Sequence, residues 1–365
     1  MRVSVLFGTR PETIKCSPFI IEGMKRDHDV KVLFTGQHQE MATPILDFFD
    51  IRVDANFEVM RPNQSLASMS SLMLELLESR SEFKETDALV VQGDTTSAYI
   101  GAYWAFLNKI PVIHLEAGLR THNIFSPFPE EANRQLISKI ASVHLAPTDK
   151  AYDELIKEGA GPHRYMIGNT GLDSLRMVSE KVTTNNLPLK IKNFIDDKPY
   201  ILITSHRRES FGTGMMQIAG ALKTLAQEMP ETKFIFPVHA NPNVREVMTK
   251  ELADLSNLLL IDPMDYLSFV ALMKHAKVIV TDSGGIQEEA PTLEVPVVVM
   301  RETTERMEGI DKGFSILAGT DPRKIYHSVK SFYQSGLQAQ GPNPYGDGFS
   351  SKRAWDILEQ IGVIA

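Results

Sequence analysis

The chain has 365 residues and a net charge of -8, a length at which two domains with separate hydrophobic cores are expected. The acidic balance argues against a nucleic-acid-binding protein, so any anion site would be a local basic pocket. The single cysteine, Cys16, excludes an intrachain disulfide and a multi-thiolate zinc site. With no apolar run near the roughly 20 residues of a membrane helix, we expect a cytoplasmic protein with no membrane partner.

The first half of the sequence alternates short β-rich runs with helical stretches. Such repeated βα units predict an α/β fold with a doubly wound parallel sheet and right-handed crossovers. Ligands of these sheets bind at the carboxyl ends of the strands, at the switch point between the first and fourth strands. The expected strands are Val3 to Phe7, Val30 to Thr35, Phe57 to Met60, Ala88 to Gln92, Val112 to Glu116 and Ser142 to Leu145.

Two cations follow the first expected strand, in Gly8-Thr9-Arg10-Pro11-Glu12-Thr13-Ile14-Lys15. Gly8 permits a tight turn, and Pro11 suits the first turn of a helix whose N-terminus favours an anion. Arg10 and Lys15 therefore form a candidate basic pocket. The alternative is that both are solvated surface charges.

Carboxylates follow the fourth and fifth expected strands. Asp94 lies directly at the switch point, although it could also be the N-cap of the next helix. Alternation along the fifth strand predicts that His114 and Glu116 share one face. A metal pair is conceivable there, but a third ligand is lacking and no metal is expected. We interpret Glu116 as an acid or base.

A further helix is predicted to begin at Pro129-Glu130-Glu131. Glutamate in a first helical turn often compensates the helix dipole, and that role could account for one of this pair. Nevertheless Asp94, Glu116 and Glu130 converge on one predicted crevice. Crowded carboxylates raise one another's pKa and suit proton transfer.

The domain boundary is expected near Gly168. The first domain would cover residues 1–168 and be joined by a C-terminal helix over residues 349–365, and the second would cover 169–348. Residues 182–197 show no clean period and could be partly exposed or a mobile helix. The second half has its own βα series, and two doubly wound domains would face a central cleft. Its expected strands are Tyr200 to Thr204, Lys233 to Pro237, Leu258 to Ile261, Val278 to Thr281 and Val295 to Met300.

Two histidines follow strands of the second domain. His206 precedes Arg207 and Arg208, so we interpret it as a phosphate-binding or proton-transfer residue rather than an ordinary loop histidine. His239 could face the cleft or serve local structure. Phe269 fits either the core or a surface on which a base stacks.

The stretch Asp282-Ser283-Gly284-Gly285 follows a buried strand and opens a predicted helix. Small residues at such a position can turn backbone amides toward an anion, although an ordinary βα turn has the same residues. Glu289, in the same helix, would suit a ribose diol as acceptor. Arg306 follows the next strand and could reach a diphosphate.

Together these motifs resemble the non-hydrolysing UDP-N-acetylglucosamine 2-epimerases. The resemblance covers nearly the whole chain and implies the two-domain glycosyltransferase-B architecture, a closing cleft, an isomerase without a cofactor and a homodimer. The implied reaction inverts C2 of the sugar through departure of UDP to 2-acetamidoglucal and its re-addition, which would supply N-acetylmannosamine-type sugars for surface polysaccharide. The motifs are Phe7-Gly8-Thr9-Arg10-Pro11-Glu12, Gly36-Gln37-His38, Gly93-Asp94-Thr95, His114-Leu115-Glu116-Ala117-Gly118-Leu119-Arg120, Pro129-Glu130-Glu131, Asn133-Arg134, His206-Arg207-Arg208-Glu209, Pro237-Val238-His239, Asp282-Ser283-Gly284-Gly285 and Thr303-Thr304-Glu305-Arg306.

The resemblance also implies roles for single residues. Asp94, Glu116 and Glu130 would be the acid and base positions, without a decision as to which abstracts the proton. Ser283 and Gly284 would form the β-phosphate turn, with Glu289 at the ribose and Phe269 at the uracil. The remaining residues expected at the diphosphate or sugar are Arg10, Lys15, Arg134, His206, His239, Gly285 and Arg306.

The sequence departs from the family pattern in two regions. Met307 replaces a usual proline and Glu294 a usual glycine, which affects the loop that presents Arg306. Gln37, His38 and Gln64 lie where many bacterial members bind a second, activating substrate molecule. Because Glu40 and Asn63 in that region differ from the expected residues, we hypothesise that activation by substrate is weak or absent.

Three other functions fit parts of the pattern. One is a 2-epimerase of another UDP-2-acetamido sugar of the L-fucosamine type. Another is a glycosyltransferase of the same architecture, which would leave the C2 hydrogen of its donor in place. The third is a nucleotide-sugar-binding regulator without turnover, against which the carboxylates argue.

Overall fold

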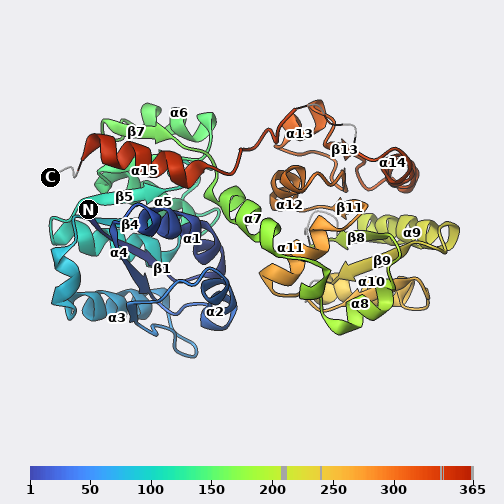
Figure 1. Cartoon of the computed structure of the whole chain (residues 1–365), viewed down its shortest axis with the longest axis horizontal. Coiled ribbons are helices and arrows are strands. Elements are labelled where there is room, and N and C mark those ends of the chain that lie inside the picture. The colour runs from blue at the N-terminus through green and yellow to red at the C-terminus, as the bar shows by residue number, and fades with distance from the viewer. Residues whose placement is uncertain (207–211, 239–240, 338, 340, 363–365) are drawn as a thin grey trace. The chain divides into compact units, whose positions relative to one another are not determined.

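The computed structural model describes the chain apart from residues 207–211, 239–240, 338, 340 and 363–365, and the side chain of residue 243. The chain divides into two compact units (Figure 1). Unit 1 comprises Met1–Ser174 with Gly348–Ala365, and unit 2 comprises Leu175–Asp347. Each unit is built on its own parallel sheet with helices on both faces, as the alternating βα pattern predicts.

The sheet of unit 1 has seven strands in the order β3-β2-β1-β4-β5-β6-β7. All neighbouring pairs are parallel. Because β1 lies between β2 and β4, the strand order reverses there, and the predicted switch point between the first and fourth strands is confirmed. The strands are β1 (Arg2–Phe7), β2 (Asp29–Phe34), β3 (Ala55–Asn56), β4 (Ala88–Gln92), β5 (Val112–Leu115), β6 (Val143–Ala146) and β7 (His163–Met166).

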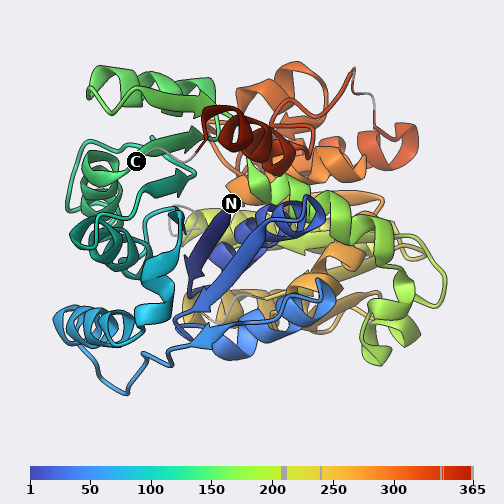
Figure 2. The same ribbon diagram turned by 60° about the vertical axis from the view of Figure 1, so that its left-hand side comes forward.

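Helices cover both faces of this sheet (Figures 1 and 2). On one face α1 packs against α2 and α15, and on the other α4 packs against α3 and α5. The central strands are consequently buried on both sides, which explains their nearly continuous apolar sequence. The helices are α1 (Arg10–Lys25), α2 (Gln39–Phe48), α3 (Leu66–Glu78), α4 (Thr96–Leu107), α5 (Glu130–Ile140), α6 (Asp149–Lys157), α7 (Thr170–Lys181), which runs on into unit 2, and α15 (Ser350–Ile361); η1 (Ser81–Glu85) is a 3-10 turn.

The C-terminal helix α15 is fixed to unit 1 by a buried carboxylate. Asp173 accepts hydrogen bonds from the amides of Ser350 at 3.0 Å and Ser351 at 2.6 Å. Two otherwise unsatisfied N–H groups of the helix start thereby gain a partner. Farther along the helix, the buried Trp355 donates its indole N–H to the carbonyl of Phe19 at 2.8 Å.

The sheet of unit 2 has six parallel strands in the order β10-β9-β8-β11-β12-β13. Its switch point lies between β8 and β11. Helices α10 and α14 both pack against α9. The elements are η2 (Thr184–Asn186), α8 (Leu189–Ile195), β8 (Tyr200–Thr204), α9 (Thr213–Glu228), β9 (Lys233–Pro237), α10 (Pro242–Leu252), β10 (Leu258–Ile261), α11 (Tyr266–Lys274), β11 (Val278–Thr281), α12 (Gly284–Glu289), η4 (Ala290–Leu293), β12 (Val297–Val299), α13 (Met307–Asp311), β13 (Ser315–Leu317) and α14 (Pro322–Ser335).

Three elements differ from the sequence prediction. The third strand is Ala55–Asn56 and not Phe57 to Met60, because Glu58 takes a left-handed conformation with φ of 48° and ends the strand. Strands β7 and β13 were not predicted, since both are short and lie at sheet edges where the apolar pattern is weak. Residues 182–197 form η2 and the short helix α8. Among the described residues, no helix is long and apolar enough to cross a membrane.

Candidate functional site

The loop after β1 is held by a buried carboxylate, Glu12. Its Oε2 accepts the amides of Gly8 at 3.0 Å and Thr9 at 2.7 Å, while the Thr9 hydroxyl caps the start of α1. Thr95, the N-cap of α4, donates its hydroxyl to the other oxygen of Glu12. Burial raises the pKa of Glu12 despite these hydrogen bonds. Glu12 therefore joins the loops at the carboxyl ends of β1 and β4.

Gly8 is required by its neighbours, because a Cβ there would lie 1.8 Å from Oγ1 of Thr35. Beside this loop, Gln37 accepts a hydrogen bond from Ser97 at 3.2 Å, and Nδ1 of His38 lies 3.4 Å from the amide of Arg10. Burial and the nearby Arg10 lower the pKa of His38.

Gln64 has a local contact, as its side-chain oxygen accepts the amide of Arg61 at 3.1 Å. The structure thus places Gln37 beside the start of α4 and His38 beside the start of α1, and it gives Gln64 a role within its own loop.

Asp94 lies in a turn that is fixed at three points. Gly93, with φ of 69°, lets the chain leave β4, and its carbonyl oxygen lies 2.7 Å from Nε2 of His114. Asn133 donates to the Asp94 carbonyl at 2.9 Å, and the Arg134 guanidinium pairs with the Asp94 carboxylate. The alternative that Asp94 caps the next helix is wrong, because Thr95 occupies the N-cap. The Asp94 side chain is thus available for chemistry.

The pKa of Asp94 is raised above its ordinary value. Burial is the largest cause, and the nearby charge of Glu116 adds to it, while Arg134 and Lys15 act in the opposite direction. A carboxylate with a raised pKa is a better proton acceptor than an exposed aspartate. The same interactions show that Asp94 and Glu116 belong to one electrostatic cluster.

Glu116 lies just beyond the end of β5, where its backbone is left-handed with φ of 62°. The expectation that His114 and Glu116 share a strand face is therefore wrong, because strand alternation ends at Leu115. Both the Lys15 ammonium and the Gln92 amide donate to Oε2 of Glu116. Lys15, expected at the diphosphate, is thus in contact with a carboxylate of the cluster.

His114 is fully buried in β5. Burial lowers its pKa to about 3, so the ring is neutral near pH 7 and its Nε2–H donates to the Gly93 carbonyl. The structure accordingly gives His114 the task of supporting the turn that carries Asp94.

The adjacent glutamates at the start of α5 have different surroundings. Glu131 is fully buried and accepts the amides of Thr121 at 3.0 Å and His122 at 3.1 Å. Burial alone would raise the pKa of Glu131, but a hydrogen bond from Gln135 and those from the two amides lower it below its ordinary value. Glu131 therefore anchors the preceding loop.

Glu130 is the partly exposed member of the pair. It lies four residues before Arg134, on the helix face that carries the Asp94 partner. The hydrogen bonds and ion pairs of the cluster join Asp94 to Arg134 and Glu116 to Lys15.

In unit 2, the ends of β8 and β11 lie side by side. The hydroxyls of Thr204 and Thr281 are 2.6 Å apart, and the residues that follow continue this pairing. Asp282 is fully buried and accepts from the Ser205 hydroxyl and the His206 amide, each at 2.9 Å. Nδ1 of the His206 ring lies 3.1 Å from Asp282 Oδ1. His206 is thereby held at the strand end where it was predicted.

The turn after Asp282 packs against the guanidinium of Arg306. Ser283 precedes α12, and its amide donates to Thr281 Oγ1 at 2.9 Å. A Cβ on Gly284 would lie 2.7 Å from Cζ of Arg306, so a side chain there would displace the guanidinium from its position. Arg306 also donates to Glu288 through Nε at 2.9 Å. The structure brings together Ser283, Gly284 and Arg306, as the sequence predicts.

The loop that presents Arg306 is anchored on both sides. Thr304 accepts the Arg306 amide at 3.2 Å and donates to Gln287 at 2.7 Å. The Tyr345 hydroxyl donates to the Arg306 carbonyl at 2.8 Å. The Met307 substitution leaves this loop with defined contacts, since Met307 begins α13 directly after it.

Glu294 has φ of 57° after η4. This left-handed conformation accounts for the glycine that is usual at the position.

Tyr266, at the start of α11, is the residue beside which Glu289 is placed. Burial and then Glu289 raise the pKa of the Tyr266 hydroxyl. Phe269 is half-buried and lies one helical turn after Tyr266 on α11. Gly285 follows in α12, where an added Cβ would meet only Ser283 Oγ at 3.9 Å. His239 lies outside the described residues.

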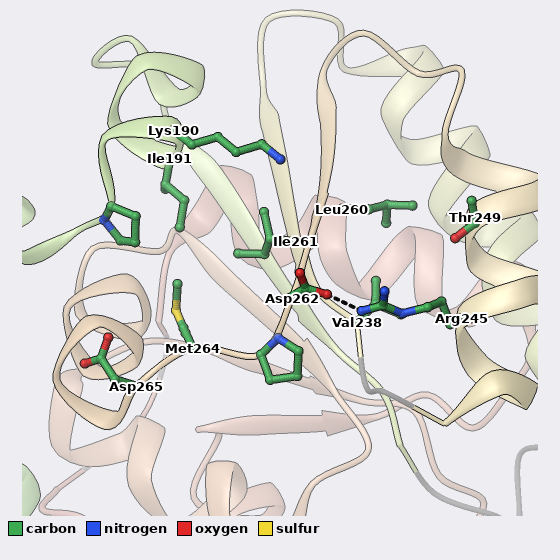
Figure 3. Close-up of a pocket in the computed structure, with 12 residues that line it drawn as sticks. Lys190, Ile191, Val238, Arg245, Thr249, Leu260, Ile261, Asp262, Met264 and Asp265 are labelled. Atoms are coloured by element: carbon green, nitrogen blue, oxygen red, sulfur yellow. Dashed lines mark hydrogen bonds and ion pairs between the residues drawn. The ribbon is translucent and has the colours of Figure 1, made fainter. Parts of the chain in front are cut away.

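A hollow of about 560 Å³ opens beyond the carboxyl ends of β9 and β10 (Figure 3). Val238 and Ile261 form part of its wall, and Arg245 pairs with Asp262 at its rim. Its described lining includes none of the residues predicted for the site. No group of three or more His, Cys, Asp or Glu side chains among the described residues could hold a metal ion.

Sequence reasoning missed several residues that fix the site. Glu12 could have been found from the sequence, because Thr9-Arg10-Pro11-Glu12 matches the S/T-x-x-E capping box. Asp282 follows a buried strand directly, a position that the strand-end argument already marked. The contacts of Gln92, Asn133 and Tyr345 depend on tertiary structure and have no local signal.

The comparisons with known proteins agree over the whole length. A family model described as UDP-N-acetylglucosamine 2-epimerase matches residues 22–359. The chain is 42% identical to the UDP-N-acetylglucosamine 2-epimerase of Yersinia pestis, with 100% of both chains covered, and 42% identical to that of Escherichia coli K12, with 98% of both covered. It is similar to the crystal structure of UDP-GlcNAc 2-epimerase from Neisseria meningitidis bound to UDP-GlcNAc, with a TM-score of 0.80, 39% identity, and 99% of this chain and 100% of the other covered.

Proposed function

The chain belongs to the UDP-N-acetylglucosamine 2-epimerase family, and we propose that it interconverts UDP-N-acetylglucosamine and UDP-N-acetylmannosamine. The observation that carries this proposal is the cluster in which Asp94 and Glu116 are held against Arg134 and Lys15 at the ends of β4 and β5. Fixed carboxylates of this kind suit abstraction and return of a proton. The similar solved structure that holds UDP-GlcNAc supports this choice of substrate.

The proposed reaction inverts C2 by elimination and re-addition. A carboxylate takes the C2 proton, the electrons of the C2–H bond form the C1–C2 double bond, and the C1–O bond breaks to release UDP from 2-acetamidoglucal. UDP then re-adds at C1 while a proton reaches C2 from the other face. Asp94, Glu116 and Glu130 are the candidates for both proton steps. No oxidation occurs, so the scheme needs no redox cofactor.

The released UDP has to stay bound for the reaction to be reversible. Arg306 beside Gly284, together with Ser283 and His206, offers a guanidinium, an imidazole and a turn of small residues to a diphosphate. We propose that Glu289 binds the ribose and Phe269 the uracil. The proton-transfer candidates belong to unit 1, and Ser283, Gly284, His206 and Arg306 belong to unit 2, so we propose that turnover requires residues of both units.

We also propose that the protein is a homodimer that acts in the cytoplasm, where its product would enter the synthesis of surface polysaccharide. Apolar side chains on the neighbouring helices α4 and α5 are exposed, with Phe106 at 52%, Leu107 at 57% and Leu136 at 47%. Clustered apolar residues of this kind support a subunit interface. Leu107→Glu should shift the sedimentation coefficient from dimer to monomer, and an unchanged dimer would place the interface elsewhere.

The function is tested by incubating the protein with UDP-N-acetylglucosamine alone in heavy water and following the sugar by NMR. We expect deuterium at C2 and the appearance of the manno epimer. Free N-acetylmannosamine with released UDP would indicate a hydrolysing enzyme. A sugar that keeps its C2 hydrogen would contradict the proposal and favour another substrate or a transferase.

A further inference from the structure

Asp282 is a buried carboxylate, and one of its partners is His206, a residue expected at the diphosphate. Ser205 donates its hydroxyl to Oδ2 at 2.9 Å, and the His206 amide donates to the same oxygen at 2.9 Å. The ring nitrogen Nδ1 of His206 lies 3.1 Å from Oδ1. A buried carboxylate needs donors, and these donors come from consecutive residues after β8.

The contact fixes the direction of the His206 ring. The Asp282 side chain is fully buried, whereas 42% of the His206 side chain is exposed. The ring nitrogens lie on opposite sides of an imidazole, so Nε2 is directed away from the buried carboxylate. A carboxylate at Nδ1 also keeps a proton on that nitrogen and stabilises the imidazolium that forms when Nε2 is protonated.

The same aspartate precedes the turn that lies under Arg306. Ser283 follows it directly, and the Ser283 amide is fixed by Thr281 Oγ1. Arg306 approaches Gly284 so closely that a Cβ there would clash with the guanidinium. Asp282 therefore connects two neighbouring features of unit 2 that could contact one diphosphate.

We propose that Asp282 is a positioning residue that holds His206 with Nδ1 protonated and Nε2 presented to the β-phosphate of UDP. This inference rests on the proposed function, because the histidine would serve the departing diphosphate. When the C1–O bond breaks, its electron pair passes to the phosphate oxygen, and the imidazolium form of His206, with Nδ1–H on Asp282, donates a hydrogen bond or its proton from Nε2 to that oxygen. The proton returns to Nε2 when UDP re-adds, so the cycle balances.

The first test is the tautomer of His206 in the unliganded protein. Protein with ¹⁵N-labelled histidine would be examined by long-range proton–nitrogen NMR, with His206 assigned by the signal missing in His206→Asn. We expect the neutral ring to carry its proton on Nδ1, and Asp282→Asn to remove this preference. A wild-type ring protonated on Nε2 would overturn the proposal. This experiment needs no turnover, so its outcome is separate from that of the proposed function.

The second test is a double-mutant cycle on epimerisation. Asp282→Asn should lower kcat by about 10²-fold in the wild-type background, the low end of what a positioned general acid contributes. In the His206→Asn background the same change should cost less than about threefold, because the residue through which Asp282 acts is gone. Equal losses in both backgrounds would show a purely structural role and overturn the proposal.

Ser205→Ala is the matched control, because it removes a hydrogen bond from the same carboxylate and leaves the imidazole in place. We expect its kcat to stay within about threefold of wild type. A loss as large as that of Asp282→Asn would assign the effect to burial of the carboxylate and contradict the positioning role.

Discussion

At the carboxyl ends of its strands, unit 1 presents carboxylates held against cations, whereas unit 2 presents a turn of small residues beneath an arginine. Asp94 and Glu116 are each paired with a basic side chain. Gly284 instead leaves space that the Arg306 guanidinium fills. Because both sheets are doubly wound, the difference lies in the loops and not in the fold.

Each sheet end therefore suits a different part of one reaction. Carboxylates that their neighbours hold in position, such as those of unit 1, can accept a proton and return it. A glycine turn with a nearby guanidinium can hold an anion whose charge grows as a bond breaks. If these tasks are separate, substitutions in unit 1 should lower the rate of epimerisation and substitutions in unit 2 should weaken the binding of UDP.

The largest effect is expected from the unit 1 carboxylates. Asp94→Asn and Glu116→Gln keep the size of the side chain but cannot accept a proton, so each should lower kcat by about 10²-fold or more. The rate would be measured by NMR as formation of the manno epimer at saturating substrate. Asp153→Asn, on the exposed face of α6, is the control and should be neutral. A rate within threefold of wild type would remove the residue in question from the proton-transfer scheme.

The neighbours Glu130 and Glu131 offer a comparison within one helix. Glu130→Gln should lose about 10²-fold in kcat with unchanged unfolding. Glu131→Gln should lower the free energy of unfolding by about 1–3 kcal/mol, because a buried carboxylate that anchors Thr121 and His122 loses its charge. Urea titrations and kinetics on both variants check this. The reverse assignment of the losses would contradict our account of α5.

A smaller effect is expected from the turn of unit 2. Gly284→Ala would push a methyl group to 2.7 Å from the Arg306 guanidinium carbon and displace it. We expect UDP to bind about tenfold more weakly, on the scale of one lost charge-assisted hydrogen bond. Gly220→Ala in α9, where no neighbour lies within 4 Å, should bind UDP like wild type. Equal affinity for UDP in wild type, Gly284→Ala and Gly220→Ala would show that Arg306 does not bind the diphosphate.

Acid should destabilise unit 1 through its buried histidines. Burial lowers the pKa of His114 to about 3 and of His144 to about 4, whereas both titrate near 6.5 when unfolded. Below about pH 6.5 the unfolded chain therefore binds protons that the folded chain does not. Stability should fall as pH drops toward 4, by about 1.4 kcal/mol per pH unit for each histidine.

This loss can be measured in unit 1 alone. The chain has two tryptophans, and Trp104 and Trp355 are both buried in unit 1, so their fluorescence in urea titrations reports its unfolding. Neither ring nitrogen of His144 has a partner among the described residues. His144→Leu should therefore roughly halve the slope with pH. An unchanged slope would show that other groups cause the acid sensitivity.

Much of the fold could be predicted from the sequence, because buried parallel strands are short apolar runs between helical segments. Strand β4 and the first four strands of unit 2 have the predicted bounds. The edge strands β7 and β13 escaped notice, since a short edge strand lacks that apolar signal. Prediction also failed where a left-handed residue such as Glu58 or Glu116 ended a strand early.

The sequence was enough to predict which loops carry the candidate site, but not which side chains contact one another within it. Strand-end logic located Asp94, Glu116 and His206, because topology alone brings those positions to a sheet edge. It could not show that Lys15 contacts Glu116 or that Asp282 holds His206, since such pairings join residues far apart in the sequence.

Calorimetric titration of UDP into Glu116→Gln and Arg306→Ala tests the division between the units most directly. If unit 1 moves the proton and unit 2 holds the nucleotide, Glu116→Gln should bind UDP within about threefold of wild type, and Arg306→Ala at least about tenfold more weakly. Weak binding by Glu116→Gln together with wild-type binding by Arg306→Ala would contradict the account.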